Sequence, residues 1–212
     1  MKTAIIGLGS IGSTLARNLA AGGGSLVLAD RTLSKAQALA SELGDKMSAL
    51  SVDEALGSAD VIVLTVYLDA IKELLTTHRS AFASKVVIDP SNPIAPDGSG
   101  GFKKTIPADQ SSGLMIAGLL PEGAELVKAF GTLSAGSLAS ARNRSPERAV
   151  LFYATDFAEA GRVAAALITT SGFTPVSVGG IKQSIRIEVG GDLHEFGKLG
   201  RLISAEEAES LV

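Results

Sequence analysis

The chain has 212 residues, a formal net charge of −3 and no cysteine, and 46% of its residues are hydrophobic. This length and composition are typical of one compact α/β domain with a small appendage. The charge argues against a basic surface for nucleic acid or anionic lipid, and the lack of cysteine excludes disulfides, thiolate catalysis and cysteine-metal sites. No apolar run approaches the ~20 residues of a membrane helix, and the apolar start is too short for a signal peptide, so we expect a cytoplasmic protein with no membrane partner.

The first half of the chain alternates short apolar runs with helical patterns. Residues 3–9 form an apolar run that ends in glycine, which predicts a buried strand. The next stretch has apolar residues at helical spacing and stops at three glycines, which predicts a helix over 10–21. The same reasoning predicts strands at 25–30, 47–50, 59–66 and 85–93 and helices at 33–43, 52–57 and 69–77.

The second half begins with a long loop, 90–107, that is rich in Gly, Pro and Ser and carries Lys103 and Lys104. We expect this loop to lack regular structure and to close over a substrate, since long loops are often functional. After it we expect a helix at 110–120, strands at 124–130, 149–155 and 174–180, and a helix at 156–171 with Asp156 as its N-cap. Alternating strands and helices predict a parallel sheet covered on both faces.

Residues 7–12 read Gly7-Leu8-Gly9-Ser10-Ile11-Gly12, the pattern G-x-G-x-x-G. The pattern lies between a predicted strand and a predicted helix, which is the context that dinucleotide binding requires. The first glycine makes the turn, the second lets a diphosphate approach the backbone, and the third allows close packing of helix and strand. The sequence therefore predicts a Rossmann-type doubly wound parallel sheet with a diphosphate at the helix N-terminus.

The end of the second predicted strand carries residues that suit two different cofactors. Asp30 stands where an acid binds the ribose hydroxyls of NAD, whereas Arg31, Thr32 and Lys35 offer a guanidinium, a hydroxyl and an ammonium to the 2′-phosphate of NADP. The residues alone leave both cofactors open.

We expect residues 1–180 to form the NAD(P)-binding domain and residues 181–212 to form a short C-terminal extension that contacts substrate or a second subunit. A homodimer is expected because the apolar extension has little of its own to pack against. Arg186 and Glu188 would share a face and pair if their segment were a strand. His194 is a candidate substrate contact or proton donor, and no metal site is expected.

Five segments of the sequence resemble a known family. The chain resembles the coenzyme F420-dependent NADP oxidoreductases in "IIGLGSIGSTLARNLA", "LADRTLSKA", "ADVIVLTVYLDAI", "KVVIDPSNPI" and "VKAFGTLSA". The resemblance covers most of the chain and implies a Rossmann fold that binds NADP. Gly131 stands where that family often has a histidine.

The resemblance also implies roles for individual residues. Arg31, Thr32 and Lys35 match the segment that holds the 2′-phosphate of NADP, which favours NADP over NAD here. Further cofactor contacts are implied for Thr65, Val66, Tyr67, Asn92, Gly131 and Thr132, and contacts with the second substrate for Pro93 and Leu133.

The expected function is hydride transfer between NADP(H) and a second flat redox molecule, by resemblance coenzyme F420. A flavin, quinone or ferric reductase is the alternative, and a non-enzymatic NADP-binding regulatory module is a second one. Because the cofactors carry the chemistry, no catalytic side chain is expected.

Overall fold

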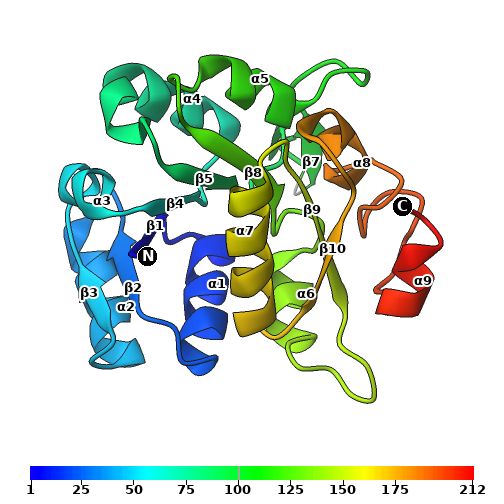
Figure 1. Ribbon diagram of the computed structural model, residues 1–212, viewed down its shortest axis with the longest axis horizontal. Helices are drawn as coiled ribbons and strands as arrows, with labels where there is room; N and C mark the ends of the chain where they lie inside the picture. The colour runs from blue at the N-terminus through cyan, green and yellow to red at the C-terminus, as the bar shows by residue number, and fades with distance from the viewer. Residues whose placement is uncertain (100) are drawn as a thin grey trace.

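The computed structural model describes residues 1–99 and 101–212 and contains an eight-stranded sheet flanked by helices (Figure 1). The strands lie in the order β10-β9-β8-β5-β4-β1-β2-β3. Their bounds are Thr3–Ile6 for β1, Leu26–Ala29 for β2, Met47–Ala49 for β3, Val61–Leu64 for β4, Val86–Asp89 for β5, Glu125–Ala129 for β8, Val150–Ala154 for β9 and Thr174–Ser177 for β10. The order confirms the expected Rossmann-type α/β fold, since the chain winds outward from β1 in both directions.

One pairing differs from the all-parallel sheet that the sequence predicted. β8 and β9 are antiparallel, whereas the other neighbouring strands of the sheet are parallel. The connection from β8 to β9 contains the short helix α6 (Ala135–Ser140), which the sequence did not predict. The strands β1, β2, β4, β5 and β8 belong to the parallel part, so their carboxyl ends share one edge of the sheet.

Helices cover both faces of the sheet (Figure 1). One apolar cluster packs α1 (Ser10–Ala21), α2 (Leu33–Leu43), α6 and α7 (Ala158–Thr170) against one face. A second cluster packs α3 (Val52–Ser58), α4 (Leu68–Thr77) and α5 (Ser112–Leu119) against the other. The central strands β1, β4 and β5 are buried throughout because both faces are covered, which explains why they read as continuous apolar runs.

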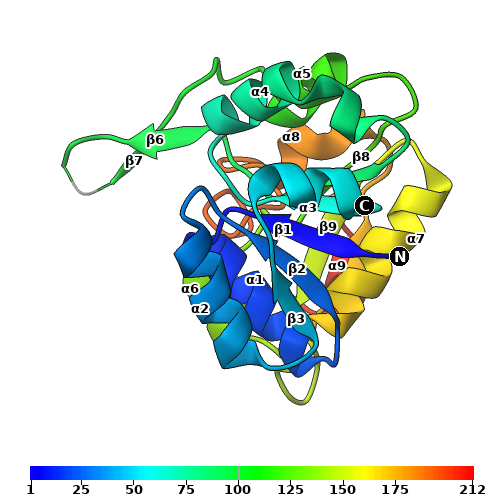
Figure 2. The same cartoon turned by 90° about the vertical axis from the view of Figure 1, so that its left-hand side faces the viewer.

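The predicted loop 90–107 is partly regular. It contains a hairpin of β6 (Ile94–Pro96) and β7 (Phe102–Lys104) that projects from the body of the protein (Figure 2). Lys104 donates to the carbonyls of Ala108 and Gln110, so its ammonium is tied to the following segment. Gly100, within the predicted loop, lies outside the described residues. The closure of this loop over a substrate stays a prediction.

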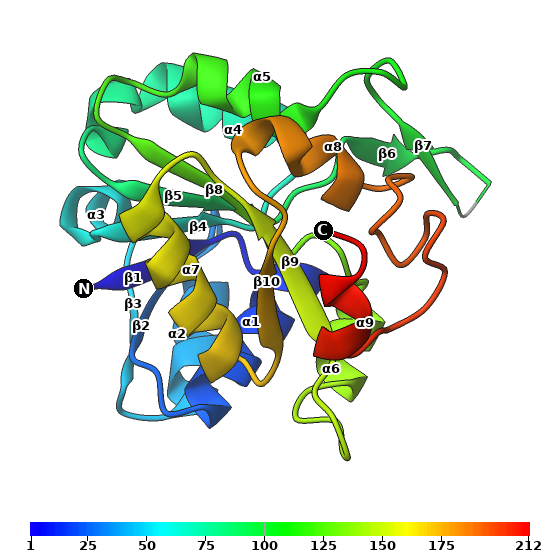
Figure 3. The same ribbon diagram turned by 45° about the vertical axis from the view of Figure 1, so that its right-hand side comes forward.

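The C-terminal extension packs on its own chain. It consists of the 3₁₀ turn Ile181–Gln183, α8 (Ser184–Ile187) and α9 (Ala205–Glu209), joined by a long irregular segment that runs beside β9 and β10 (Figure 3). Its apolar side chains, among them Leu193 and Ile203, bury Phe152 of β9. The reason for expecting a homodimer is therefore wrong, because the extension already has an intramolecular partner; the dimer itself stays a prediction.

Asp156 does not have its predicted role. The N-cap residue of α7 is Phe157, without a side-chain capping bond. The Asp156 carboxylate instead accepts a hydrogen bond from the backbone N–H of Ile181, 3.1 Å away. It thus anchors the start of the C-terminal extension, a contact across 25 residues that local sequence patterns do not encode.

Candidate functional site

The glycine pattern forms a tight turn between β1 and α1. Gly7 has a positive φ of 93°, and a Cβ there would lie 2.3 Å from Val66 Cγ1. A Cβ on Gly12 would lie 2.0 Å from the carbonyl oxygen of Gly7. By contrast, an added Cβ on Gly9 has no neighbour within 4 Å among the described residues. The first and third glycines are thus required by packing, and the second leaves open space over the turn.

That open space lies at the N-terminus of α1. Gly9 is the N-cap residue, and the first turn of the helix contains no acidic residue. The first N–H groups of a helix have no intrahelical partner and carry the positive end of its dipole. These groups, together with the absence of a side chain on Gly9, fit the diphosphate of a dinucleotide. The predicted contacts through Gly9, Ser10 and Ile11 therefore have a suitable geometry.

At the end of β2, the Asp30 carboxylate is held by the backbone. Its Oδ2 accepts from Leu8 N at 2.8 Å, its Oδ1 accepts from Thr32 N at 3.0 Å, and Lys35 Nζ lies 3.5 Å from Oδ2. Burial by itself raises the pKa of Asp30, but the hydrogen bonds from Thr32 and Leu8 and the charge of Lys35 outweigh it and lower the pKa. Asp30 therefore braces the glycine turn against the start of α2.

The three basic and polar residues beside it have a different environment. Arg31, Thr32 and Lys35 are all exposed at the start of α2. These exposed side chains can reach a phosphate, whereas the side chain of Asp30 is only 15% exposed and accepts from two backbone N–H groups. This arrangement favours the 2′-phosphate of NADP over the free ribose of NAD.

The end of β4 joins the glycine turn from the other side. Thr65 Oγ1 donates toward the carbonyls of Ile6 and Gly7, and Thr65 N donates to the Ile6 carbonyl, 2.9 Å away. Val66 packs against the core, while the side chain of Tyr67, the N-cap residue of α4, is 59% exposed. Thr65 thus has a structural role in the turn, and Tyr67 presents an accessible ring at this edge.

Asn92 links three segments beyond the end of β5. Its Nδ2 donates to the Gly131 carbonyl at 2.8 Å, and its Oδ1 accepts from Val189 N at 2.7 Å. The amide is therefore committed to the turn after β8 and to the C-terminal extension. Pro93 is buried next to it. The predicted contact of Asn92 with the cofactor stays a prediction.

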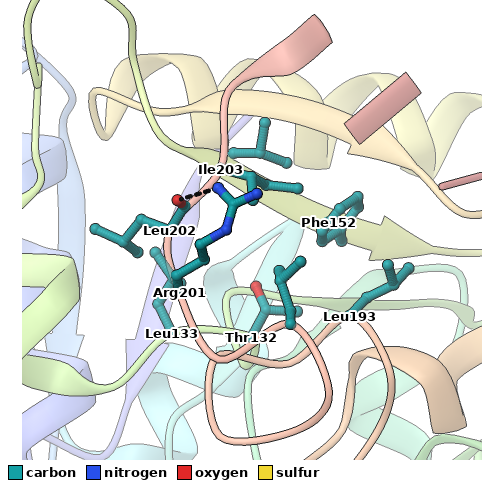
Figure 4. A pocket seen from close by; sticks show the side chains of 9 residues that line it. Thr132, Leu133, Phe152, Leu193, Arg201, Leu202 and Ile203 are labelled. Carbon is teal, nitrogen blue, oxygen red and sulfur yellow. Dashed lines mark hydrogen bonds between the residues drawn. The ribbon is translucent and has the colours of Figure 1, made fainter. Parts of the chain in front are cut away.

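Thr132 and Leu133 line a small pocket between the turn after β8 and the C-terminal extension (Figure 4). Leu133 also belongs to the main core. The Thr132 Oγ1 atom is buried without a hydrogen-bond partner among the described residues, and Phe152 and Leu193 line the same pocket. The predicted contacts of Thr132 with the cofactor and of Leu133 with the second substrate stay predictions.

Two acidic residues of the extension contact helix starts, and the sequence did not reveal either contact. Glu188, 1% exposed, accepts from Ser112 N at 3.0 Å and Gly113 N at 2.9 Å at the start of α5. Glu195 accepts from Ser134 N at 2.9 Å at the start of α6. Carboxylates at these positions are stabilised by the free N–H groups and the helix dipole. The two carboxylates fix the C-terminal extension to the starts of α5 and α6.

The predicted pairing of Arg186 with Glu188 is wrong, because residues 184–187 form a helix rather than a strand. Arg186 instead forms an ion pair with Asp192, 2.9 Å apart. Among the residues that the structure describes, no group of three or more His, Cys, Asp or Glu side chains is placed to hold a metal ion. Within the same residues, no helix is long and apolar enough to cross a membrane.

His194 is buried beside Gly131. Only 2% of the residue is exposed, its Nδ1 accepts from Phe196 N at 2.9 Å, and its ring lies 5.7 Å from that of Phe196. Burial lowers the pKa of His194, against the opposing effects of a hydrogen bond with the Gly131 backbone and the charge of Glu195. The shift favours the neutral form of the imidazole in the folded protein. The imidazole of His194, which belongs to the C-terminal extension, therefore lies beside the Gly131 turn.

The lowered pKa of His194 predicts a loss of stability in mild acid. Unfolded histidine has a pKa near 6.5, so below about pH 6.5 the unfolded state binds a proton that the folded state rejects. The free energy of unfolding should be constant above that pH and fall by at most about 1.4 kcal/mol per pH unit as the pH drops toward the folded pKa. Urea titrations between pH 7.5 and 5.5 measure this slope.

The matched variant for this prediction is His194→Gln, which should be less stable overall but should lack the slope due to this residue. The lowered carboxylate pKa values of Asp30 and Glu207 act only below about pH 4.5, outside the window. An equal slope in both proteins would show that His194 does not titrate as inferred.

Known proteins with this architecture carry further information. The family described as "NADP oxidoreductase coenzyme F420-dependent" matches residues 2–93. An F420-dependent NADP reductase from Methanothermobacter thermautotrophicus is 30% identical over 199 residues, which cover 89% of this chain and 85% of the relative.

Two solved structures are similar over nearly the whole chain. A hypothetical protein from Sinorhizobium meliloti has 30% identity and a TM-score of 0.83, with 96% of this chain and 95% of the other covered. A protein from Arthrobacter sp. FB24, provisionally assigned as an F420-dependent NADP reductase, has 21% identity, a TM-score of 0.73 and 87% coverage of both chains, which shows the shared fold. The identity to the archaeal reductase and its coverage show that the chain belongs to the family of coenzyme F420-dependent NADP oxidoreductases and is an NADP-dependent oxidoreductase.

Proposed function

We propose that this protein transfers a hydride between NADP(H) and coenzyme F420, or a flat redox molecule of the same kind. The observation that carries the proposal is the meeting of four chain segments at one sheet edge. The glycine turn after β1, the basic cluster after β2 and the turns after β5 and β8 all lie at the carboxyl ends of parallel strands. Ligands of doubly wound sheets bind at this edge, where the winding direction reverses. The reductase named above supports F420 as the acceptor.

The chain's own groups would hold NADP(H) along this edge. The N–H groups at the start of α1 would bind the diphosphate over Gly9, and Arg31, Thr32 and Lys35 would bind the 2′-phosphate. The nicotinamide would then lie toward Tyr67 and the turns that Asn92 joins. When bound, NADPH supplies the hydride; the protein orients the two rings and excludes water between them.

Two accessible aromatic rings support a flat acceptor. Tyr67 is 59% exposed at the end of β4, and Phe196 is 65% exposed two residues after His194, which contacts the Gly131 turn. Exposed aromatic side chains beside a cofactor site are suited to stacking on a planar heterocycle. A flavin, a quinone or a ferric chelate would be the alternative acceptor, and a regulatory protein that only binds NADP would show no turnover with any of them.

An acceptor comparison tests the proposal. Purified protein is mixed with NADPH and, in separate reactions, with F420, FMN, menadione or a ferric chelate, and NADPH oxidation is followed by absorbance. We expect F420 to be reduced with a turnover on the order of 10 per second, at least about tenfold faster than any other acceptor. Faster reduction of another acceptor would assign that molecule instead, and no turnover at all would favour the regulatory alternative.

A further inference from the structure

Lys128 of β8 is a buried charge next to the candidate site. The residue is 1% exposed, and its ammonium is completely enclosed by the protein. Burying an ammonium is unfavourable unless it is paired and hydrogen-bonded. Its Nζ lies 2.6 Å from Asp89 Oδ2, 2.5 Å from the Ser91 carbonyl oxygen and 3.2 Å from Ser112 Oγ. All three donor positions are therefore used.

The Asp89–Lys128 pair holds both backbone polar groups of Ser91. Asp89, itself 0% exposed, accepts from Ser91 N through Oδ1 at 2.8 Å and from Lys128 through Oδ2. Lys128 in turn donates to the Ser91 carbonyl. The turn after β5 is thus fixed at Ser91 from both sides by two side chains on neighbouring strands.

The next residue transmits this constraint. Asn92 follows Ser91 and joins the turn after β5 to Gly131 and to Val189 of the C-terminal extension. Gly131 lies so close to the first turn that a Cβ there would be 2.8 Å from the Pro90 carbonyl oxygen. A shift of Ser91 would therefore displace Asn92 and, with it, the two turns at the end of β5 and β8.

The stability of the fold does not by itself explain the pair. Buried ion pairs gain little net free energy compared with apolar residues of similar size, because both charges lose their hydration. The same face of the two strands is otherwise lined by aliphatic side chains, as Val87 and Leu126, two residues before Asp89 and Lys128, show. A geometric requirement at the Ser91 turn accounts for charges at this position better than packing does.

We propose that Lys128, with Asp89, is a positioning residue for the nicotinamide end of the cofactor site. The pair holds the turn of Ser91 and Asn92 in the orientation that a bound nicotinamide requires, without contacting the ring. This inference rests on the proposed function, since it assumes that the nicotinamide lies at these turns.

The test compares two ligands on the complete protein. NADPH contains the nicotinamide, whereas 2′,5′-ADP keeps the adenosine and the 2′-phosphate and lacks it. In Lys128→Met, the Kd for NADPH should rise by about tenfold or more while the Kd for 2′,5′-ADP stays within about twofold, since only the nicotinamide end loses its support. The kcat of NADPH oxidation should fall as well.

Two further variants keep the test decisive. Lys128→Met leaves the Asp89 charge unpaired and lowers stability, so the neutral double variant Asp89→Asn/Lys128→Met removes both charges and should fold. It should show the same selective loss of NADPH. Ser112→Ala removes only the contact of Lys128 with α5 and should change neither Kd by more than about twofold.

The possible outcomes separate the two proposals. If the folded double variant, verified by thermal unfolding, binds NADPH like the wild type or loses both ligands by the same factor, the positioning role is refuted. If the wild type itself binds NADPH no more tightly than 2′,5′-ADP and shows no turnover, the nicotinamide does not lie at these turns and the proposed function fails first.

Discussion

Replacing Arg31 with alanine is expected to remove most of the preference of this protein for NADPH over NADH. Arg31 is exposed at the start of α2, and a guanidinium binds a phosphate through two parallel hydrogen bonds. Wild-type protein should bind NADPH at least about tenfold more tightly than NADH, which corresponds to about 1.4 kcal/mol. In Arg31→Ala the Kd for NADPH should rise by about that factor while the Kd for NADH stays unchanged, because NADH has no 2′-phosphate.

Isothermal titration of both nucleotides measures this difference. Arg162→Ala is a matched control, since it removes the same charge from an exposed ion pair with Glu159 on α7 and should leave both Kd values unchanged. If NADH binds as tightly as NADPH and Arg31→Ala changes little, the Asp30 carboxylate would be the group that binds the ribose. The assignment of NADP to this site would then be wrong, and the proposed hydride transfer between NADP(H) and F420 would fail with it.

Alanine at Gly9 and alanine at Gly12 should have different effects. An added Cβ on Gly9 has no described neighbour within 4 Å and the residue has an ordinary φ of −68°, so Gly9→Ala should change the free energy of unfolding by less than about 0.5 kcal/mol. The new methyl group would occupy the space over the turn and keep a diphosphate from the backbone. The Kd for NADPH should therefore rise by about a hundredfold.

Gly12→Ala places its Cβ 2.0 Å from the Gly7 carbonyl and 2.5 Å from Thr65 Oγ1, so the turn itself must shift. We expect this variant to lose about 1–3 kcal/mol of stability in addition to NADPH binding. Urea unfolding and NADPH titration of the same preparations separate the two effects. Gly57→Ala on the exposed side of α3 serves as the control and should be neutral or slightly stabilising. Normal NADPH binding by Gly9→Ala would show that the diphosphate does not bind at this turn.

The sequence by itself determined the Rossmann-type architecture and the glycine turn after the first strand. The parallel strands are buried on both faces, so their apolar runs are visible without any alternation, and the helices between them show a helical period. The pattern from Gly7 to Gly12 is equally local, because its glycines lie within one strand, one turn and one helix that follow each other directly in the chain. The place of Arg31, Thr32 and Lys35 followed from the end of the next strand.

Only the tertiary structure decided how the charged side chains are used. Asp30 was ambiguous in the sequence because its choice of partner depends on Leu8, which lies 22 residues away. Nothing in the sequence indicated the partner of Lys128, because its ammonium meets Asp89, 39 residues away, only when β8 pairs with β5. Glu188 was expected to pair with Arg186 and instead caps α5.

The physical reason is the range of the interactions. Hydrophobic periodicity and turn chemistry act between residues close in the chain, so they can be recognised in a sequence. A buried carboxylate or ammonium binds whichever hydrogen-bonding group the packed strands and helices bring to it, and this choice is made only when distant segments meet. The alternation of strands and helices was therefore encoded locally, while the arrangement of the turns after β5 and β8 depends on contacts of these strands with α5 and the C-terminal extension.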